Sequence, residues 1–129
     1  MGYRSVVRVM TTLESFEEMQ EIAFEIKERE NIAEHMLLIP IPGSDPESVF
    51  DYYDAQEDYL CFGFDWIKWY DNYKDVSLFM EVLEVANERG VDWQFIRTGE
   101  DYDDVENFSS DNFYDNATTV MNITVDISY

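Results

Sequence analysis

The sequence is poor in the residues from which most catalytic and metal centres are built. Its 129 residues include one cysteine, Cys61, and one histidine, His35. A single cysteine cannot form an intramolecular disulfide, so a reducing compartment is the simplest setting. One Cys and one His also fall short of the ligands of a zinc site. We interpret Cys61 as an inert thiol and His35 as the first residue of a strand.

Long apolar runs and glycine-rich loops are also missing. No stretch approaches the roughly 20 apolar residues of a membrane-spanning helix, and no basic segment followed by an apolar one opens the chain. The five glycines are scattered, which argues against a loop that cradles phosphates. These absences predict a cytoplasmic protein with neither a signal peptide nor a membrane span.

Basic residues are scarce. Eight Lys and Arg face 29 Asp and Glu, which gives a formal net charge of -21. Such a chain repels nucleic acid and anionic membranes and attracts basic surfaces. We therefore expect no direct nucleic-acid or membrane binding, and a basic protein as partner.

The few bases are unevenly placed along the chain. Residues 30–67 hold nine acids and no base, and residues 98–129 hold eight acids and no base. Two interpretations stay open. In the first, the acids only keep the protein soluble. In the second, they form an electronegative surface that fits the basic groove of a nucleic-acid-binding protein. Such a surface would mimic duplex DNA, which carries a charge every ~1.7 Å of its axis.

The chain is rich enough in apolar residues to form a single domain, residues 1–129, because 46% are hydrophobic and 16% aromatic. Its centre is the stretch from Tyr59 to Phe79. Leu60, Phe62, Phe64 and Trp66 alternate there, which predicts a strand with one strongly aromatic, buried face.

Two helices are predicted, one before that strand in the sequence and one after it. Apolar residues recur at helical spacing from Phe16 to Ile26, with Thr12 or Ser15 as the cap and an end near Asn31. The second helix begins with Asp75 as its cap and is stopped by Gly90.

Other strands are expected at residues 3–12, 35–41, 91–98 and 119–129, the last with the cleanest alternation. Residues 43–58 and 99–116 are predicted as acidic loops, the first with a helical turn that begins with Asp45 as cap and Pro46. The order predicts an α+β fold. Two helices lie on one face of a four- to five-stranded, mainly antiparallel sheet, ferredoxin-like with a split βαβ and an added C-terminal strand.

The sequence contains no recognisable catalytic motif. The acids around Asp101 fail the EF-hand pattern, because no glycine stands at the sixth loop position and Asn112 stands at the twelfth. Nothing singles out a carboxylate pair among 29 acids. We predict no catalytic residue, no metal and no cofactor.

The expected partner-binding residues are the acids of the two loops and two aromatic anchors of the kind that dominate binding hot spots. They are Asp51, Asp54, Glu57, Asp58, Trp69, Tyr70, Glu100, Asp101, Asp103, Asp104, Glu106, Asp111 and Asp115.

Three segments resemble small acidic proteins encoded by tailed bacteriophages. They are the opening MGYRS, DWIKWYDNYKDV at 65–76 and FIRTGEDYDD at 95–104. The resemblance implies a phage accessory protein that acts in the bacterial host cytoplasm, where small acidic phage proteins often look like anti-CRISPR or anti-restriction inhibitors. It implies no catalytic residue.

Charge and resemblance together lead to one hypothesis: a non-enzymatic, DNA-mimic inhibitor that binds a basic, nucleic-acid-handling host defence protein. The alternative is a phage structural or regulatory interaction module, sensed by host immunity or paired as a homodimer through its C-terminal strand. In that alternative, the acidity is only a solubility coat.

Overall fold

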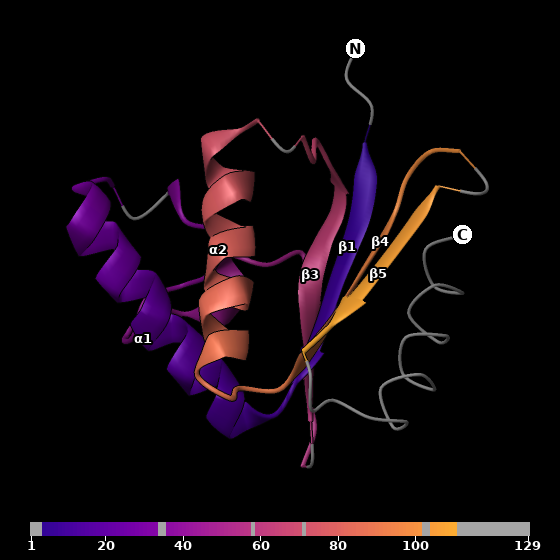
Figure 1. Ribbon diagram of the computed structural model, residues 1–129. Coiled ribbons are helices and arrows are strands. Elements are labelled where there is room, and N and C mark those ends of the chain that lie inside the picture. The colour runs from indigo at the N-terminus through magenta and orange to yellow at the C-terminus, as the bar shows by residue number, and fades with distance from the viewer. Residues whose placement is uncertain (1–3, 34–35, 58, 71, 102–103, 111–129) are drawn as a thin grey trace.

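A computed structural model describes residues 4–33, 36–57, 59–70, 72–101 and 104–110, and the fold is a sheet covered by two helices (Figure 1). The elements in chain order are β1 (Ser5–Thr11), α1 (Leu13–Glu30), the short 3-10 helix η2 (Pro46–Ser48), β2 (Tyr52–Ala55), β3 (Leu60–Ile67), α2 (Lys74–Glu88), β4 (Trp93–Thr98) and β5 (Val105–Ser109).

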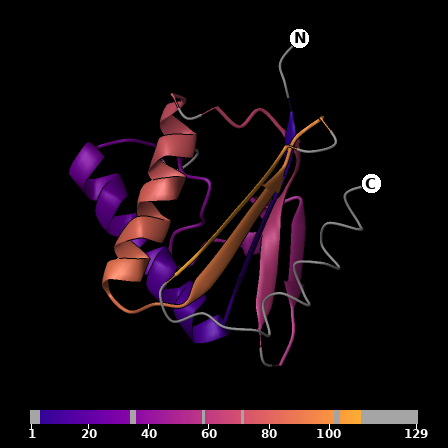
Figure 2. The same cartoon turned by 45° about the vertical axis from the view of Figure 1, so that its right-hand side comes forward.

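The five strands lie in the order β2-β3-β1-β4-β5, and every neighbouring pair is antiparallel. Figures 1 and 2 show both helices on the same side of this sheet. The first four strands and two helices follow the split βαβ order: α1 crosses over β3 between β1 and β2, and α2 crosses over β1 between β3 and β4. The prediction of an α+β fold with two helices on one face is confirmed.

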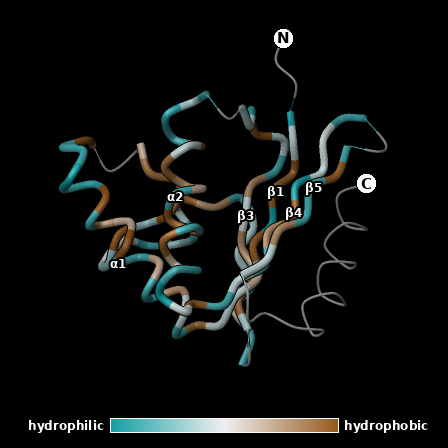
Figure 3. Tube along the Cα trace, viewed as in Figure 1, coloured by the Kyte–Doolittle hydropathy of each residue, from teal (hydrophilic) through white to brown (hydrophobic). Residues whose placement is uncertain are grey.

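The core fills the space between the helices and the sheet. Phe62 lies at its centre, with its ring centroid 4.4 Å from that of Phe50 and 5.1 Å from that of Phe16 on α1. The indole N–H of Trp93 donates a 2.9 Å hydrogen bond to the Leu83 carbonyl and so joins β4 to α2. Figure 3 shows hydrophobic residues along this interface and hydrophilic ones on the outer turns.

The first helix begins and ends as its sequence predicts. The Thr12 hydroxyl accepts a 3.1 Å hydrogen bond from the Ser15 N–H, so Thr12 is the cap. Asn31 closes the helix in the left-handed region, with φ 53°. The second helix differs slightly from the prediction that Asp75 caps it. It begins at Lys74, its N-cap Tyr73 makes no side-chain hydrogen bond, and Asp75 lies inside the first turn.

The predicted strand at 35–41 is wrong over its described residues, 36–41, which form no strand. Leu37 and Ile39 are nevertheless buried in the core, so the short apolar run that predicted a strand is an irregular segment that packs there. Pro40 and Pro42 lack the N–H that a sheet ladder needs. The strand that occupies this place in the topology is β2, which lies within the predicted loop 43–58, after the helical turn capped by Asp45.

The second predicted loop, 99–116, likewise contains a strand. β5 pairs with β4 from Gln94 opposite Ser109 to Thr98 opposite Val105, and it is the fifth strand of the sheet. The predicted C-terminal strand at 119–129 lies outside the described residues.

Trp66 does not share the buried face of β3 with Leu60, Phe62 and Phe64. The pairing of β3 with β1 shifts by one residue between Val7 opposite Phe64 and Ser5 opposite Ile67. This irregularity turns Trp66 outward, with φ 54° and 46% of its surface exposed. The expectation of a buried Trp66 is therefore wrong.

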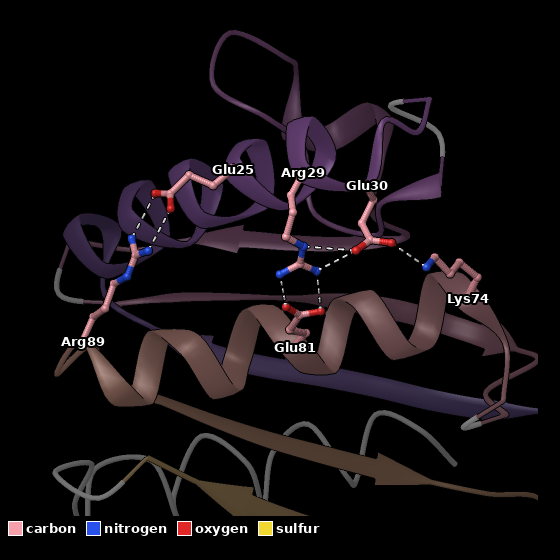
Figure 4. Close-up of polar contacts among 6 residues, drawn as sticks. All are labelled: Glu25, Arg29, Glu30, Lys74, Glu81 and Arg89. Atoms are coloured by element: carbon pink, nitrogen blue, oxygen red, sulfur yellow. Dashed lines mark hydrogen bonds and ion pairs between the residues drawn. The ribbon is translucent and has the colours of Figure 1, made fainter.

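Three ion pairs join the two helices across their exposed sides (Figure 4). Arg29 holds Glu81 through two hydrogen bonds of 2.7 and 3.0 Å, and Arg89 holds Glu25 through two of 2.8 and 3.0 Å. Glu30 accepts from both Arg29 and Lys74. We call this set the helix zipper: Glu25, Arg29, Glu30, Lys74, Glu81 and Arg89.

The zipper makes stability depend on pH in acid. The hydrogen bond from Lys74 holds the pKa of Glu30 below its ordinary value of 4.5, and that from Arg89 lowers the pKa of Glu25. A carboxyl with a lowered pKa in the folded state adds stability above its unfolded pKa and loses it as pH falls through the folded pKa. We expect Glu30→Gln to unfold at lower urea concentration than the parent at pH 7, and the difference to disappear as pH falls below 4.5.

Glu17→Gln, on the exposed side of the same helix, is the control, because Glu17 has no part in the zipper. Urea titrations of both variants between pH 7 and about pH 2 measure the effect, since carboxyls titrate across that range. A Glu30→Gln deficit that persists undiminished in acid would contradict this role of the zipper.

Gly63 allows β1 and β3 to approach each other. A Cβ at this position would overlap the carbonyl oxygen of Val7. We expect Gly63→Ala to lower the free energy of unfolding by about 2–3 kcal/mol, the cost of overpacking a tight contact. Gly43→Ala is the matched control. Its Cβ meets nothing within 4 Å, and its φ of +94° costs about 1 kcal/mol. Equal losses in urea unfolding would argue against the close approach.

Candidate interaction surface at the acidic end of the sheet

One end of the sheet gathers acids from both base-poor windows of the sequence. The pairing places the start of β1, the end of β3, the end of β4 and the start of β5 together, because Ser5 is opposite Ile67 and Thr98 is opposite both Val6 and Val105. Figure 1 shows this end at the top of the view, where β1 begins. We call it the acidic end and define it by Asp51, Asp65, Glu100, Asp101, Asp104 and Glu106.

The first group at this end is held by β2 and β3. Asp51 precedes β2, and its carboxylate accepts a 2.9 Å hydrogen bond from the Asp65 N–H. The Asp65 carboxylate accepts a 2.7 Å bond from Arg8, whose guanidinium is only 2% exposed and lies 4.2 Å from the centre of the Tyr52 ring. Asp65 thus has a counter-charge, while Asp51 is held by a backbone N–H.

The second group comes from the β4–β5 turn. The Glu100 carboxylate accepts a hydrogen bond from the Arg4 backbone N–H, and the Arg4 guanidinium donates 2.9 Å to the Trp66 carbonyl. Glu100 and Asp101 are exposed. Arg4 therefore links the β4–β5 turn to the end of β3, so the two acidic windows meet at one surface.

Two of the predicted binding acids have an internal task instead. Arg97 is about nine-tenths buried and binds Asp104, Glu106 and the Ser5 hydroxyl. Burial alone would lower the pKa of Arg97, but these two carboxylates raise it above its ordinary value. Asp104 and Glu106 thus neutralise a buried cation. Residues 98–129 hold no base of their own, but the sheet brings Arg97 to them as a counter-charge.

The other predicted acids lie elsewhere or outside the described residues. Asp54 lies within β2 and accepts a hydrogen bond from Gln56, and Glu57 is exposed in the turn from β2 to β3, at the opposite end of the sheet. Asp58, Asp103, Asp111 and Asp115 lie outside the described residues.

The two predicted aromatic anchors differ in burial. Trp69 is 8% exposed and packs against Phe64, Phe79 and Phe95, so the expectation of a surface anchor there is wrong. It is a core residue, in the segment that joins β3 to α2. Tyr70 is half-buried, with its ring 5.0 Å from that of Tyr73, which is 41% exposed.

Trp66 is the aromatic residue that sequence reasoning missed at this surface. It directly follows Asp65, and its own backbone carbonyl accepts the hydrogen bond from Arg4. It is the most exposed of the three tryptophans, at 46%. A bulky residue with positive φ is a backbone outlier, of a kind that clusters at functional sites. The alternation from Leu60 to Phe64 concealed it, because a shift in pairing leaves no mark in the sequence.

The rest of the described chain adds no metal site and no membrane helix. Among the described residues, no three His, Cys, Asp or Glu side chains gather closely enough to hold a metal ion. Within the same ranges, no helix is both long and apolar enough to cross a membrane. Comparisons with known proteins find no matching family model, no matching curated protein and no matching solved structure.

The two neighbouring tryptophans provide a test of this geometry. We expect Trp69→Ala to lower the free energy of unfolding by about 3–5 kcal/mol, because it empties a core site. Trp66→Ala should change it by no more than about 0.5 kcal/mol, the range of an exposed side chain. Urea unfolding measures both. A larger loss for Trp66→Ala would show that its indole is part of the core.

Proposed function

We propose that this protein is a non-enzymatic inhibitor that binds a basic, nucleic-acid-handling protein of a bacterial defence system. The observation that carries the proposal is that most Lys and Arg side chains are already paired with acids of the same chain. All eight Lys and Arg lie within the described residues, and six of them form ion pairs with carboxylates of the same chain. The surplus of acids therefore faces outward with little positive surface beside it.

The acidic end supports the same proposal. It combines carboxylates from both windows with the exposed indole of Trp66. Aromatic residues and opposite charges are the features that dominate protein interfaces. An arginine or lysine of a partner could contact the indole face and the neighbouring carboxylates together.

The mode of action that follows is occupation of the partner's nucleic-acid groove. The net charge of -21 accelerates the approach of a basic protein by electrostatic steering. Once bound, the acids take the place of phosphates and exclude the nucleic acid. The resemblance of three segments to phage proteins supports a phage origin and action in the host cytoplasm, on a CRISPR or restriction component.

A second function is favoured by a different observation. Val105 and Phe108 on β5 are 48% and 46% exposed, as expected for a contact made by apolar side chains. On that basis the chain would be a phage structural or regulatory interaction module, and its acids would serve solubility only. Salt separates the two functions, because screening weakens charge contacts and leaves apolar ones in place.

The decisive experiment is capture of a partner from host lysate by the tagged protein at about 50 mM and about 500 mM salt, which shortens the screening length several-fold. We expect a basic nuclease, CRISPR or restriction protein that elutes with salt. We also expect duplex DNA to compete with the inhibitor for it. A partner retained unchanged at high salt would contradict inhibition by charge.

A charge-neutral variant locates the surface. Asp51→Asn, Glu100→Gln and Asp101→Asn together keep the acceptor oxygens and remove three charges. We expect about tenfold weaker binding, from roughly 0.5 kcal/mol for each exposed charge pair. The control removes three exposed charges from α1, with Glu17→Gln, Glu18→Gln and Glu21→Gln. Titration of the captured partner by calorimetry compares them, and equal losses would mean that the acidic end has no special part.

A further inference from the structure

Within the part of the chain that the structure describes, the outer edge of β5 is an unprotected strand edge. All five of its residues, Val105–Ser109, are exposed, and no strand among the described residues pairs with its outer side. Exposed edges are commonly blocked by proline, lysine or a bulge. β5 contains no proline and no lysine, and its pairing with β4 runs without a shift in register.

The hydrogen bonds at the two ends of the hairpin show which backbone groups face outward. The Ser110 N–H donates to the Trp93 carbonyl, and the Gly99 N–H donates to the Asp104 carbonyl. In an antiparallel pair, hydrogen-bonded residues alternate along the strand. Residues 104, 106, 108 and 110 therefore turn their N–H and C=O toward β4, and Val105, Asn107 and Ser109 turn theirs away from the sheet.

The side chains along this edge leave it nearly neutral. Glu106 is the one charged residue of β5, and its carboxylate is held by Arg97. Asn107 accepts a 2.9 Å hydrogen bond from the Gln94 side chain. Phe108 stacks on Phe95 at 5.9 Å and still exposes 46% of its surface. Beside the start of the strand, Glu100 and Asp101 add two exposed carboxylates.

We propose that the partner binds by adding an extended, Lys- or Arg-bearing segment to the outer edge of β5 as a sixth strand. This inference rests on the proposed function and deepens it. The backbone groups of Val105, Asn107 and Ser109 pair with the segment, and Val105 and Phe108 contact its apolar side chains. Charge identifies the occupant, because a molecule of net charge -21 attracts a basic segment and repels a second copy of itself.

A proline at the centre of the edge tests the backbone contacts. Asn107→Pro removes one outward N–H and the side-chain bond from Gln94, but leaves every backbone hydrogen bond between β4 and β5 in place. Proline is tolerated on edge strands. Asn107→Ala is the control. It keeps the N–H and loses the same bond to Gln94. Slow amide exchange at Glu106 and Phe108 in both variants shows that the hairpin is intact.

The probe is a ten-residue peptide of alternating valine and lysine, together with the same peptide N-methylated at every second residue. We expect the unmodified peptide to protect the amides of Val105, Asn107 and Ser109 from exchange. Asn107→Pro and N-methylation should each weaken binding at least tenfold, and Asn107→Ala no more than about twofold. Equal binding of both peptides, or equal binding by parent and Asn107→Pro, would overturn the proposal.

The same variants separate this inference from the function on which it rests. If Asn107→Pro captures the host partner as the parent does, while neutralising the acidic end weakens capture, the docking edge is wrong and the inhibitor function stands. If salt leaves capture unchanged, the inhibitor function fails, whatever the proline does. A mass that doubles with concentration in sedimentation, and is halved by Asn107→Pro, would assign the edge to a second copy and overturn the basic segment.

Discussion

Repulsion among 29 carboxylates is the constraint on which the rest of this structure depends. The chain has eight bases, and it places them where elements meet. Arg29, Lys74 and Arg89 join α1 to α2, and Arg97 joins β1, β4 and β5. Each exposed pair contributes little by itself. Together they concentrate attraction at the junctions and leave the repulsion on outer surfaces, where water and salt screen it.

Fold class and core could be predicted because they depend on patterns that survive in a single sequence. Helical spacing gave α1 and α2 within a residue or two, and alternation gave the core face of β3 from Leu60 to Phe64. β2 and β5 were missed because they are short edge strands with acidic or exposed residues, which resemble loops. The strand predicted at 35–41 was wrong over residues 36–41 because a short apolar run that packs into the core without a sheet partner looks the same in sequence as a buried strand.

The candidate surface was only partly predictable, for a related reason. Counting charges along the chain finds the acids, but it does not show which bases from distant strands lie beside them in the folded sheet. Asp51, Glu100 and Asp101 lie at the same end of the sheet, whereas Asp104 and Glu106 bind Arg97, which lies outside their window. Trp66 was expected to be buried and Trp69 to be exposed, and the structure shows the reverse. The outward position of Trp66 follows from a one-residue shift in the pairing of β3 with β1, which is a tertiary feature.

The acidic end and the β5 edge would act at different stages of binding. Long-range charge governs how fast a basic partner arrives, and it weakens as salt is added. Backbone pairing and apolar contact at β5, together with the close charge contacts that salt weakens, govern how long the partner stays. The two surfaces are continuous, because Glu100 and Asp101 lie in the turn that leads into β5. A partner drawn to the acids therefore arrives beside the open strand edge.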